Sequence, residues 1–510
     1  MALTKAHNRM IEGAPVNVLD FGATGDGVTD DTAAIQAAID SLATTGGEVF
    51  FPSGRYSITG INVLTNSITL TGTGKAAPFN ANVGVSSMLA SVLVYASATG
   101  NAVTLGQTGA SCQSCSVVNL SIWGNTTGYL LSVTGNHLLF DQLFLEQEGT
   151  GGGLYLSDAY QITARDIVAR GVNVTPKKSS VGIWFDTTSN GTWSGGGSFK
   201  FERCNVSFFD TGYRMGADFD GSITPYGGSG SLCMEVCQAY KCRVGFHTSY
   251  LITQIDYNSC RAEECDTHGY LIDNSCAGAT IRGGYVLHTG TVNIKESVRI
   301  GNDSGTAGID KASHVLIDNV AFGNINNATI PYINVMGDSN VIDVTIQNCG
   351  FWKYLGYGVM LSGTVPTQVN IINNNFEMFS GRAILNQFQC VNAVGSDFRY
   401  EARFIDNFIE TSGLKESEIQ TVSGTPVNLN NAVGEFLINT SGASAIINLP
   451  ASPNIGDTLK VIKKFGANTA TITPQGGATI VGFNAANAVL TNAGDSAEIQ
   501  YVQSGRWVIQ

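Results

Sequence analysis

The sequence predicts an all-β protein whose main part is a parallel β-helix, in which short strands wind into stacked coils. After residue 60 apolar and polar residues alternate, which is the period of a β-strand, and the alternating runs recur as one repeated unit. In each unit the side chains of four successive residues are expected to point inward, outward, inward and outward. A bend residue follows, and the next residue points inward again. The second outward position of five successive units holds Asp141, Arg165, Glu202, Glu235 and Asn258, at intervals of 24, 37, 33 and 23 residues.

An interval in the low twenties corresponds to one coil of a β-helix, and the longer intervals are coils that carry loop insertions. Many bend residues are Asn, Asp, Ser or Arg, and Asn and Asp tolerate a left-handed backbone. Because each coil buries its inward residues against its neighbours, Cys204, Cys237 and Cys260 are expected to form an internal stack. A β-sandwich is the alternative architecture, but it predicts hairpin turns every ~8–12 residues rather than a three-strand period.

The segment 16–58 is expected to begin the β-helix with a strand, a glycine-rich loop and a single amphipathic helix. Thr29 or Asp31 is in position to cap this helix, and Gly46-Gly47 ends it. A helix with one apolar stripe suits a lid over the open end of stacked strands. The stripe has the i, i+3, i+4, i+7 spacing and consists of Ile35, Ala38, Ile39 and Leu42.

This segment contains GDGVTDDTAAIQAAI, which resembles the GDGxTDDTxAIQxAI signature of the pectate-lyase-like superfamily. The stretch LTKAHNRMIEGAPVNVLDFGA resembles the lead-in of the phage tailspike branch of that superfamily. The resemblance implies a right-handed parallel β-helix, a homotrimer, and a bacterial capsular or O-antigen polysaccharide as the partner. It also implies a location in the virion, on the phage tail, with action outside the bacterial cell. It does not say which bond is cut, because hydrolases, lyases and inert binders share this fold.

Three regions are expected along the chain: a lead-in or linker stub (1–15), the β-helix with the catalytic site (16–420, with the capping segment 16–58), and a small antiparallel β domain (421–510). In the resembled tailspikes the terminal module trimerises the shaft or binds sugar. Their lead-in joins a domain that anchors the spike to the phage tail or baseplate. The short lead-in here indicates that the anchor is missing, or that the spike docks on another spike.

Composition excludes several classes of partner. The formal net charge of -13 argues against nucleic acid, whose phosphates need a basic face. There is no apolar run of 18 residues or more, so no membrane insertion is expected. The histidines are dispersed, and Cys112-Gln-Ser-Cys115 is a lone CxxC without a second pair, so neither a metal site nor a cofactor is expected.

The outward columns supply the candidate catalytic residues. Outward residues of stacked strands lie ~4.8 Å apart, which places Glu202 one coil from Glu235, and Asp256 one coil further in the adjacent column. Carboxylates ~5 Å apart suit a retaining glycosidase, and ~6.5–9.5 Å leaves room for the water of an inverting one. Like charges this close should raise one pKa, as a general acid requires. Alternatively, these are ordinary solvated residues that pair with Lys200 and Arg165.

Two long loop insertions support this location, because function often resides in loops on a rigid scaffold. Their aromatic residues Trp184, Trp193 and Tyr226 are expected to bind sugar rings together with Lys200 and Arg165, although Trp184 equally suits a core position. Asp218 and Asp220 form a second-choice acid pair.

The favoured function is therefore a polysaccharide depolymerase that hydrolyses glycosidic bonds. One alternative is a lyase that acts by β-elimination on a uronate-containing glycan. Another is a receptor-binding spike that adheres without cleaving.

Overall fold

The computed structural model places two compact units, formed by residues Met1–Ile372 with Ser380–Arg403, and by Asn373–Phe379 with Phe404–Gln510. The expected division at residue 420 stays a prediction. The structure describes residues 13–75, 90–107, 110–186, 198–216, 231–249, 252–273, 276, 278–287, 295–301, 312–325, 330–337, 341–354, 357–363, 369–377, 384–386, 402–405, 408–411, 414–415, 419–421, 427–428, 434–439, 444–449, 458–465, 468–475, 478–481, 488–492, 494–503 and 506–509.

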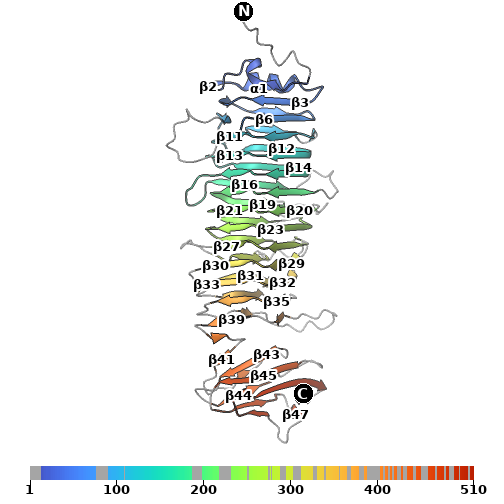
Figure 1. Cartoon of the computed structure of the whole chain (residues 1–510), viewed down its shortest axis with the longest axis vertical. Coiled ribbons are helices and arrows are strands. Elements are labelled where there is room, and N and C mark those ends of the chain that lie inside the picture. Colours follow the sequence, from blue (N-terminus) through green and yellow to red (C-terminus); the bar gives the residue numbers. More distant parts are fainter. Residues whose placement is uncertain are drawn as a thin grey trace, which may run out of the picture. The chain divides into compact units, whose positions relative to one another are not determined.

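The first unit is a parallel β-helix, as predicted (Figure 1). Its larger sheet contains β1 (Val16–Asn17), β3 (Gly47–Phe51), β5 (Ile61–Val63), β6 (Ile68–Gly72), β8 (Val103–Leu105), β9 (Cys112–Gln113), β10 (Ser116–Val118), β12 (Tyr129–Asp141), β14 (Gly152–Arg165), β16 (Ser179–Asp186), β17 (Phe199–Glu202), β19 (Phe209–Met215), β20 (Ser231–Glu235), β22 (Val244–Thr248), β23 (Gln254–Asn258), β25 (His268–Ile272), β26 (Ala279–Arg282), β28 (Val298–Ile300), β29 (Ala312–Asp318), β31 (Pro331–Gly337), β32 (Val341–Gln347), β34 (Tyr357–Gly363), β35 (Val369–Ile372) and β37 (Ile384–Asn386). Its second sheet contains β2 (Asp26–Asp30), β4 (Gly54–Ile58), β7 (Ser91–Tyr95), β11 (Ser121–Gly124), β13 (Phe144–Gln147), β15 (Val168–Arg170), β18 (Asn205–Ser207), β21 (Gln238–Tyr240), β24 (Arg261–Glu263), β27 (Tyr285–Leu287), β30 (Ala321–Ile325) and β33 (Gly350–Tyr354).

Each coil contributes three strands, which confirms the three-strand period. Strands β16, β17 and β18 of one coil pair in parallel with β19, β20 and β21 of the next. The register also confirms the predicted outward column, because Asp141, Arg165, Glu202, Glu235 and Asn258 are aligned in that order from strand to strand.

The bend residues have the left-handed backbone that the repeat predicted. Asp166, Ser259 and Asn319 have φ values of 53°, 52° and 54°. Val236 occupies the same place with φ 53°, although a β-branched side chain is strongly disfavoured there. The bend is therefore imposed by the coil and is not set by the local preference of every residue.

Stacked side chains fill the interior of the coils. Cys204, Cys237 and Cys260 are buried in consecutive coils, which confirms the predicted cysteine stack. Burial raises the pKa of the Cys204 and Cys237 thiols, so these thiols stay protonated. The ten described cysteines are all free.

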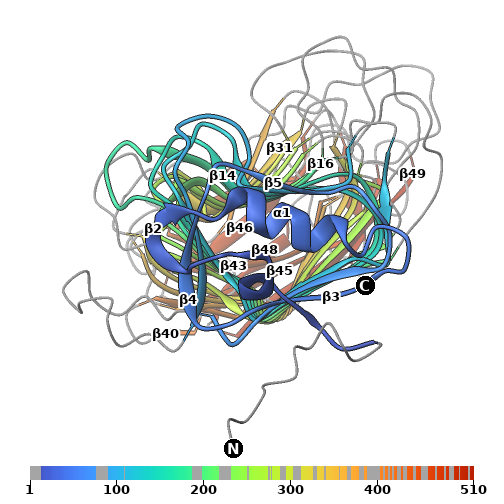
Figure 2. The same ribbon diagram turned by 90° about the horizontal axis from the view of Figure 1, so that it is seen from above.

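Helix α1 (Thr32–Asp40) lies at the N-terminal end of this unit (Figures 1 and 2). It buries Ile35, Ala38 and Ile39, as its apolar stripe predicted. Asp31, one of the two predicted capping residues, is the N-cap residue of α1, but its side chain makes no capping hydrogen bond. Asp31 instead accepts hydrogen bonds from the N–H groups of Thr24 and Gly25 at 2.6 and 3.1 Å, so this carboxylate holds the glycine-rich loop.

A buried ionic cluster lies further along the β-helix, around Glu296. The Glu296 carboxylate contacts His268 Nε2 at 3.2 Å, Arg299 Nη2 at 3.1 Å and Asn334 Nδ2 at 2.9 Å. Glu296 is only 7% exposed. The hydrogen bonds and the Arg299 charge outweigh the desolvation of this carboxyl and hold its pKa below the usual range.

The second unit is all-β, as expected, but its sheets are mixed rather than antiparallel. Strands β43 and β45 are parallel, whereas β45 and β49 are antiparallel. Its core includes Trp507, Leu459 and Ile499. The strands of this unit are β36 (Asn375–Glu377), β39 (Phe408–Thr411), β40 (Leu414–Lys415), β41 (Ile419–Thr421), β42 (Val427–Asn428), β43 (Gly434–Asn439), β44 (Ala445–Asn448), β45 (Thr458–Phe465), β46 (Ala470–Thr473), β47 (Thr479–Val481), β48 (Ala488–Leu490), β49 (Ser496–Gln503) and β50 (Arg506–Ile509).

Within the described part of the chain, no helix has both the length and the apolar character needed to cross a bilayer.

Candidate functional site

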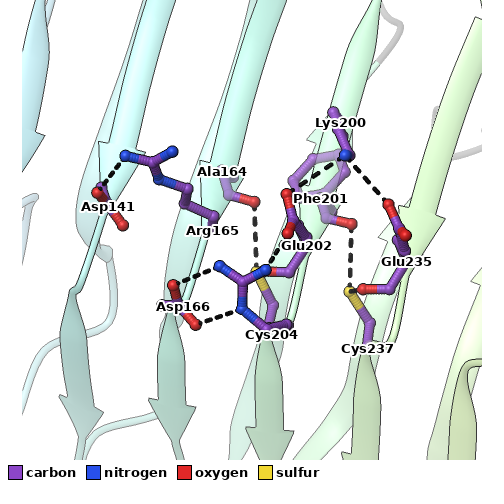
Figure 3. Close-up of polar contacts among 11 residues, drawn as sticks. Asp141, Ala164, Arg165, Asp166, Lys200, Phe201, Glu202, Cys204, Glu235 and Cys237 are labelled. Atoms are coloured by element: carbon purple, nitrogen blue, oxygen red, sulfur yellow. Dashed lines mark hydrogen bonds and ion pairs between the residues drawn. The ribbon is translucent and has the colours of Figure 1, made fainter.

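The predicted carboxylates Glu202 and Glu235 lie side by side on β17 and β20, with Lys200 between them (Figure 3). Lys200 Nζ is 3.3 Å from Glu202 Oε2 and 3.0 Å from Glu235 Oε2. The two carboxylates are therefore close neighbours, as the spacing predicted. The positive charge of the Lys200 ammonium group, which contacts both carboxylates, compensates their negative charges.

These residues belong to a longer set of ion pairs, which we call the ion-pair ladder (Asp141, Arg165, Asp166, Lys200, Glu202, Arg203 and Glu235). Arg203 contacts Glu202 and binds Asp166 through Nε and Nη2 at 2.9 and 2.8 Å. Arg165 Nη2 binds Asp141 Oδ2 at 2.7 Å. The ladder matches the alternative in which outward acids simply pair with outward bases.

The ionisation of the ladder differs from what a general acid needs. The hydrogen bond from Lys200, with the charge of Arg203, lowers the pKa of Glu202. Reciprocally, Glu235 and Glu202 raise the pKa of Lys200. The expectation that repulsion raises a carboxyl pKa is therefore wrong for Glu202, because a cation from the same strand outweighs the like charge from the next.

The other predicted residues divide into two groups. Asp256, on β23, is aligned with Cys233 of β20, which is aligned with Lys200 of β17, so it stands in the predicted adjacent column. The remaining residues lie outside the described part of the chain and are Trp193, Asp218, Asp220 and Tyr226.

A second cluster, of which the sequence predicted only Trp184, lies on the outer face of β12, β14 and β16. We call it the aromatic–acid cluster (Tyr129, Tyr155, Asp158, Trp184 and Asp186). The rings of Tyr129 and Tyr155 are stacked, with centroids 4.7 Å apart, and Trp184 meets Tyr155 edge-on at 5.2 Å. Trp184 is half-buried, and its Nε1 donates to the Gly216 carbonyl at 2.9 Å. It therefore belongs to an outer aromatic surface and not to the core.

Two carboxylates accompany these rings. Asp186 is 6% exposed, and its Oδ2 accepts a hydrogen bond from Tyr155 Oη at 2.7 Å. Asp158 is partly buried, and desolvation followed by the charge of Asp186 raises its pKa. A carboxyl with a raised pKa, which was expected in the column of Glu202, is thus present in this cluster.

A break in the strand register positions Asp158. Thr134 aligns with Ser157, but Asn136 aligns with Tyr160, so β14 carries one extra residue opposite β12. Asp158 lies in this bulge with φ 44°. Bulges commonly re-aim a side chain beside active sites.

An arginine and a histidine continue the same column in the next coils. Arg214 aligns with Trp184 and lies over its ring, with Cζ 5.0 Å from the centroid. Burial lowers the pKa of Arg214, which stays a cation in the physiological range. His247 aligns with Arg214, and its Nε2 is 2.6 Å from Asp273 Oδ2. The outer face therefore offers aromatic rings, an acid pair, a guanidinium and an imidazole in consecutive coils.

Among the described residues, no three His, Cys, Asp or Glu side chains are arranged to hold a metal ion.

Comparisons with known proteins give local sequence matches and similarities of fold. A segment is 64% identical over 45 residues to mannuronan C5-epimerase AlgE5 of Azotobacter vinelandii, and covers 9% of this chain and 4% of that protein. Another match is 37% identical over 76 residues to the tail spike protein of Shigella phage Sf6, and covers 14% of this chain and 12% of that protein. The chain thus spans only a small part of the length of these relatives.

Among solved structures, the A-module of the Azotobacter vinelandii epimerase AlgE6 superposes with a TM-score of 0.53 at 16% identity, over 78% of this chain and 100% of the module. At that identity the similarity shows the fold alone. Residues 15–271 match the family described as Rhamnogalacturonase A/epimerase, pectate lyase-like. Since this match spans half of the chain and confirms the predicted resemblance, the protein belongs to the rhamnogalacturonase A/epimerase family of pectate-lyase-like β-helix proteins.

Proposed function

We propose that the protein is a phage tailspike depolymerase that binds a bacterial surface polysaccharide, a capsule or an O-antigen, and hydrolyses its glycosidic bonds. Membership of a pectate-lyase-like family and the local similarity to the tail spike protein of Shigella phage Sf6 support the biological role. The observation that carries the chemistry is the acid pair Asp158 and Asp186 beside stacked aromatic rings.

In this proposal Asp158 is the general acid. Its raised pKa keeps a proton available nearer neutral pH than an ordinary aspartate can. Asp158 gives this proton to the glycosidic oxygen as the bond to the anomeric carbon breaks. The Asp186 carboxylate, held by Tyr155 Oη, acts on the anomeric carbon directly or through a water molecule.

The aromatic rings and the column beside them would bind the polysaccharide. Strands repeat every ~4.8 Å, so a glycan that runs across successive coils meets one outward side chain in each. Tyr155, Trp184, Arg214 and His247 are those side chains in four consecutive coils. Apolar sugar faces pack on the rings, while the hydroxyl groups bind Arg214 and His247.

The carboxylates predicted from the sequence are the alternative candidates for the catalytic acid pair. Glu202, Glu235 and Asp256 lie in neighbouring coils, but the ion pairs with Lys200 favour a structural role for the two glutamates. A lyase reading is supported by a different observation, the His247–Asp273 pair beside Arg214. A base and a cation that neutralises a uronate are the groups that β-elimination requires.

The test is depolymerisation of purified capsules and O-antigens from several bacterial strains, with fragment size and chemistry as readouts. We expect new reducing ends without unsaturated sugars, and loss of activity in Asp158→Asn and Asp186→Asn. Glu202→Gln, Glu235→Gln and Asp256→Asn should keep most of it. Unsaturated products would establish the lyase, and binding without shortening would establish an adhesive spike. Light scattering tests the proposed homotrimer, and binding to isolated phage tails tests the proposed attachment.

A further inference from the structure

A small cavity lies beside the first coils, on the second sheet. Its volume is about 240 Å³, and it is lined by Gly25, Asp26, Ser53, Gly54, Arg55, Ala90 and Val92. These residues come from β2, β4 and β7 and the segments directly before them. The candidate site occupies the other sheet, on β12, β14 and β16, so this cavity is a separate feature.

Two hydrogen-bond donors at this place are buried without an acceptor among the described residues. Arg55 lines the cavity, and its guanidinium lies over the indole of Trp123, with Cζ 5.1 Å from the ring centroid. Arg55 Nε and Trp123 Nε1 are both buried donor atoms that lack such a partner. Leaving a buried donor unpaired is costly. Of these two residues only Arg55 lines the cavity, so a ligand that brings an acceptor oxygen to its guanidinium would gain.

Asp26, which is aligned with Arg55 on the neighbouring strand, supplies an acceptor. Asp26 Oδ1 receives the N–H groups of Val28 and Thr29 at 2.8 Å each, and its Oδ2 receives the Thr29 hydroxyl at 2.8 Å. These bonds lower the pKa of Asp26 and hold its carboxylate in a fixed orientation. The cavity thus combines a fixed anion with a guanidinium.

Ala90 and Val92 form the apolar part of the lining. Ala90 and Val92 are 6% and 1% exposed and pack as one small cluster with Trp123 beside them. A ligand for this cavity therefore needs one apolar face, acceptors for the guanidinium and donors for the carboxylate. A volume of about 240 Å³ is below the ~300–1,000 Å³ of sites for drug-sized ligands, so the ligand is small.

We propose that this cavity is an accessory carbohydrate-binding site that takes one neutral monosaccharide unit of a glycan. A sugar ring has an apolar C–H face for Ala90 and Val92, and each of its hydroxyl groups both accepts and donates a hydrogen bond. Hydroxyl groups accept from Arg55 and donate to Asp26. Carboxylated sugars bind more weakly because Asp26 repels a second negative charge.

A second site on another sheet would hold the protein on the cell surface while the candidate site engages other parts of the glycan. Two linked sites raise the effective concentration of each. The inference concerns binding alone and does not depend on which residues cleave the polysaccharide.

The experiment measures saturation-transfer NMR and dissociation constants for glucose, galactose, mannose and rhamnose, with glucuronate as the charged comparison. We expect at least one neutral sugar to bind, and Arg55→Ala to weaken this binding by about tenfold or more. Arg170→Ala is the matched control, because Arg170 lies on the same sheet over the Phe208 ring but outside the cavity. It should bind as the wild type does.

Two further variants keep the inference falsifiable. Ala90→Leu fills the cavity without removing a charge and should also weaken binding, which covers the case in which Arg55→Ala unfolds. Asp186→Asn, which tests the proposed hydrolysis, should leave this binding unchanged. The inference is overturned if no neutral sugar binds, if Ala90→Leu binds like the wild type, or if Asp186→Asn abolishes the binding.

Discussion

Replacing Asp158 by Asn removes the proton that the proposed mechanism needs while keeping the size of the side chain. General acids contribute about 10²–10⁴-fold to rate, which corresponds to about 2.7–5.4 kcal/mol of transition-state free energy. Asp158 is only partly buried, so water can replace it in part. We therefore expect a loss toward the lower end, about 10²-fold in kcat for the polysaccharide.

The pH dependence has a definite sign. Desolvation and Asp186 raise the pKa of Asp158, and the acid works only while protonated. Activity of the wild type should therefore fall as pH rises through this raised pKa, and Asp158→Asn should lose that alkaline limb. The ionised form is also less favourable in the folded state than in the unfolded chain, so the variant should unfold at a higher temperature than the wild type at neutral pH.

The assay compares wild type, Asp158→Asn and Glu202→Gln on the same polysaccharide and on an oligosaccharide with an activated aryl leaving group. An aryl group departs without a proton, so it should recover most of the activity of Asp158→Asn. The assignment of the acid would be refuted if Asp158→Asn kept full activity on the polysaccharide, or if the aryl substrate gave no recovery. If Glu202→Gln alone lost activity, the catalytic site would instead be assigned to the ion-pair ladder.

Three further predictions test the fold and the ladder. Val236→Asn should stabilise the protein by about 0.5–1 kcal/mol in urea unfolding, because φ 53° disfavours a β-branched residue and the valine is 43% exposed; an unchanged or lower midpoint would contradict this. Glu296→Ala should cost about 3–5 kcal/mol, since it removes the buried carboxylate bound by Arg299. Because the pKa of Glu296 is lowered in the folded state, the stability that it contributes is present above the ordinary pKa of a glutamate and is lost as pH falls below it; a pH-independent difference between variant and wild type would refute this reasoning. Glu235→Gln should remove one of the two partners of Lys200 and cost no more than about 1 kcal/mol, the usual value of an exposed pair, in a comparison of unfolding midpoints.

The sequence predicts the β-helix well because its information is periodic. Side chains alternate with a period of two, and a one-residue error would turn every inward residue outward. The inward residues Cys204, Cys237 and Cys260 therefore determine the position of the outward residues between them, and the register agrees at each strand. The second unit lacks this repeat, and the direction of its strands depends on the connections between them. The expectation of an antiparallel domain is wrong there.

Ionisation is less predictable than position. The column correctly placed Glu202 beside Glu235, but the pKa of Glu202 depends on Lys200, which points from the same strand between the two carboxylates. The alternation of inward and outward residues correctly predicts that Lys200 lies on the outer face, but it does not predict which groups its long side chain contacts. A flexible cation two residues away reversed the sign expected from two like charges.

Asp158 could not be found from the repeat, because it lies where the repeat is interrupted. The extra residue in β14 shifts the register between Ser157 and Tyr160, so Asp158 belongs neither to the inward nor to the outward set. An uninterrupted ladder places every acid ~4.8 Å from the side chains above and below it, where a base can pair with it, as in the ion-pair ladder. A bulge removes one side chain from this pairing, and desolvation together with the charge of Asp186 then raises the pKa of Asp158. A residue that breaks the period, such as Asp158, is therefore a candidate for proton transfer that the repeat alone does not reveal.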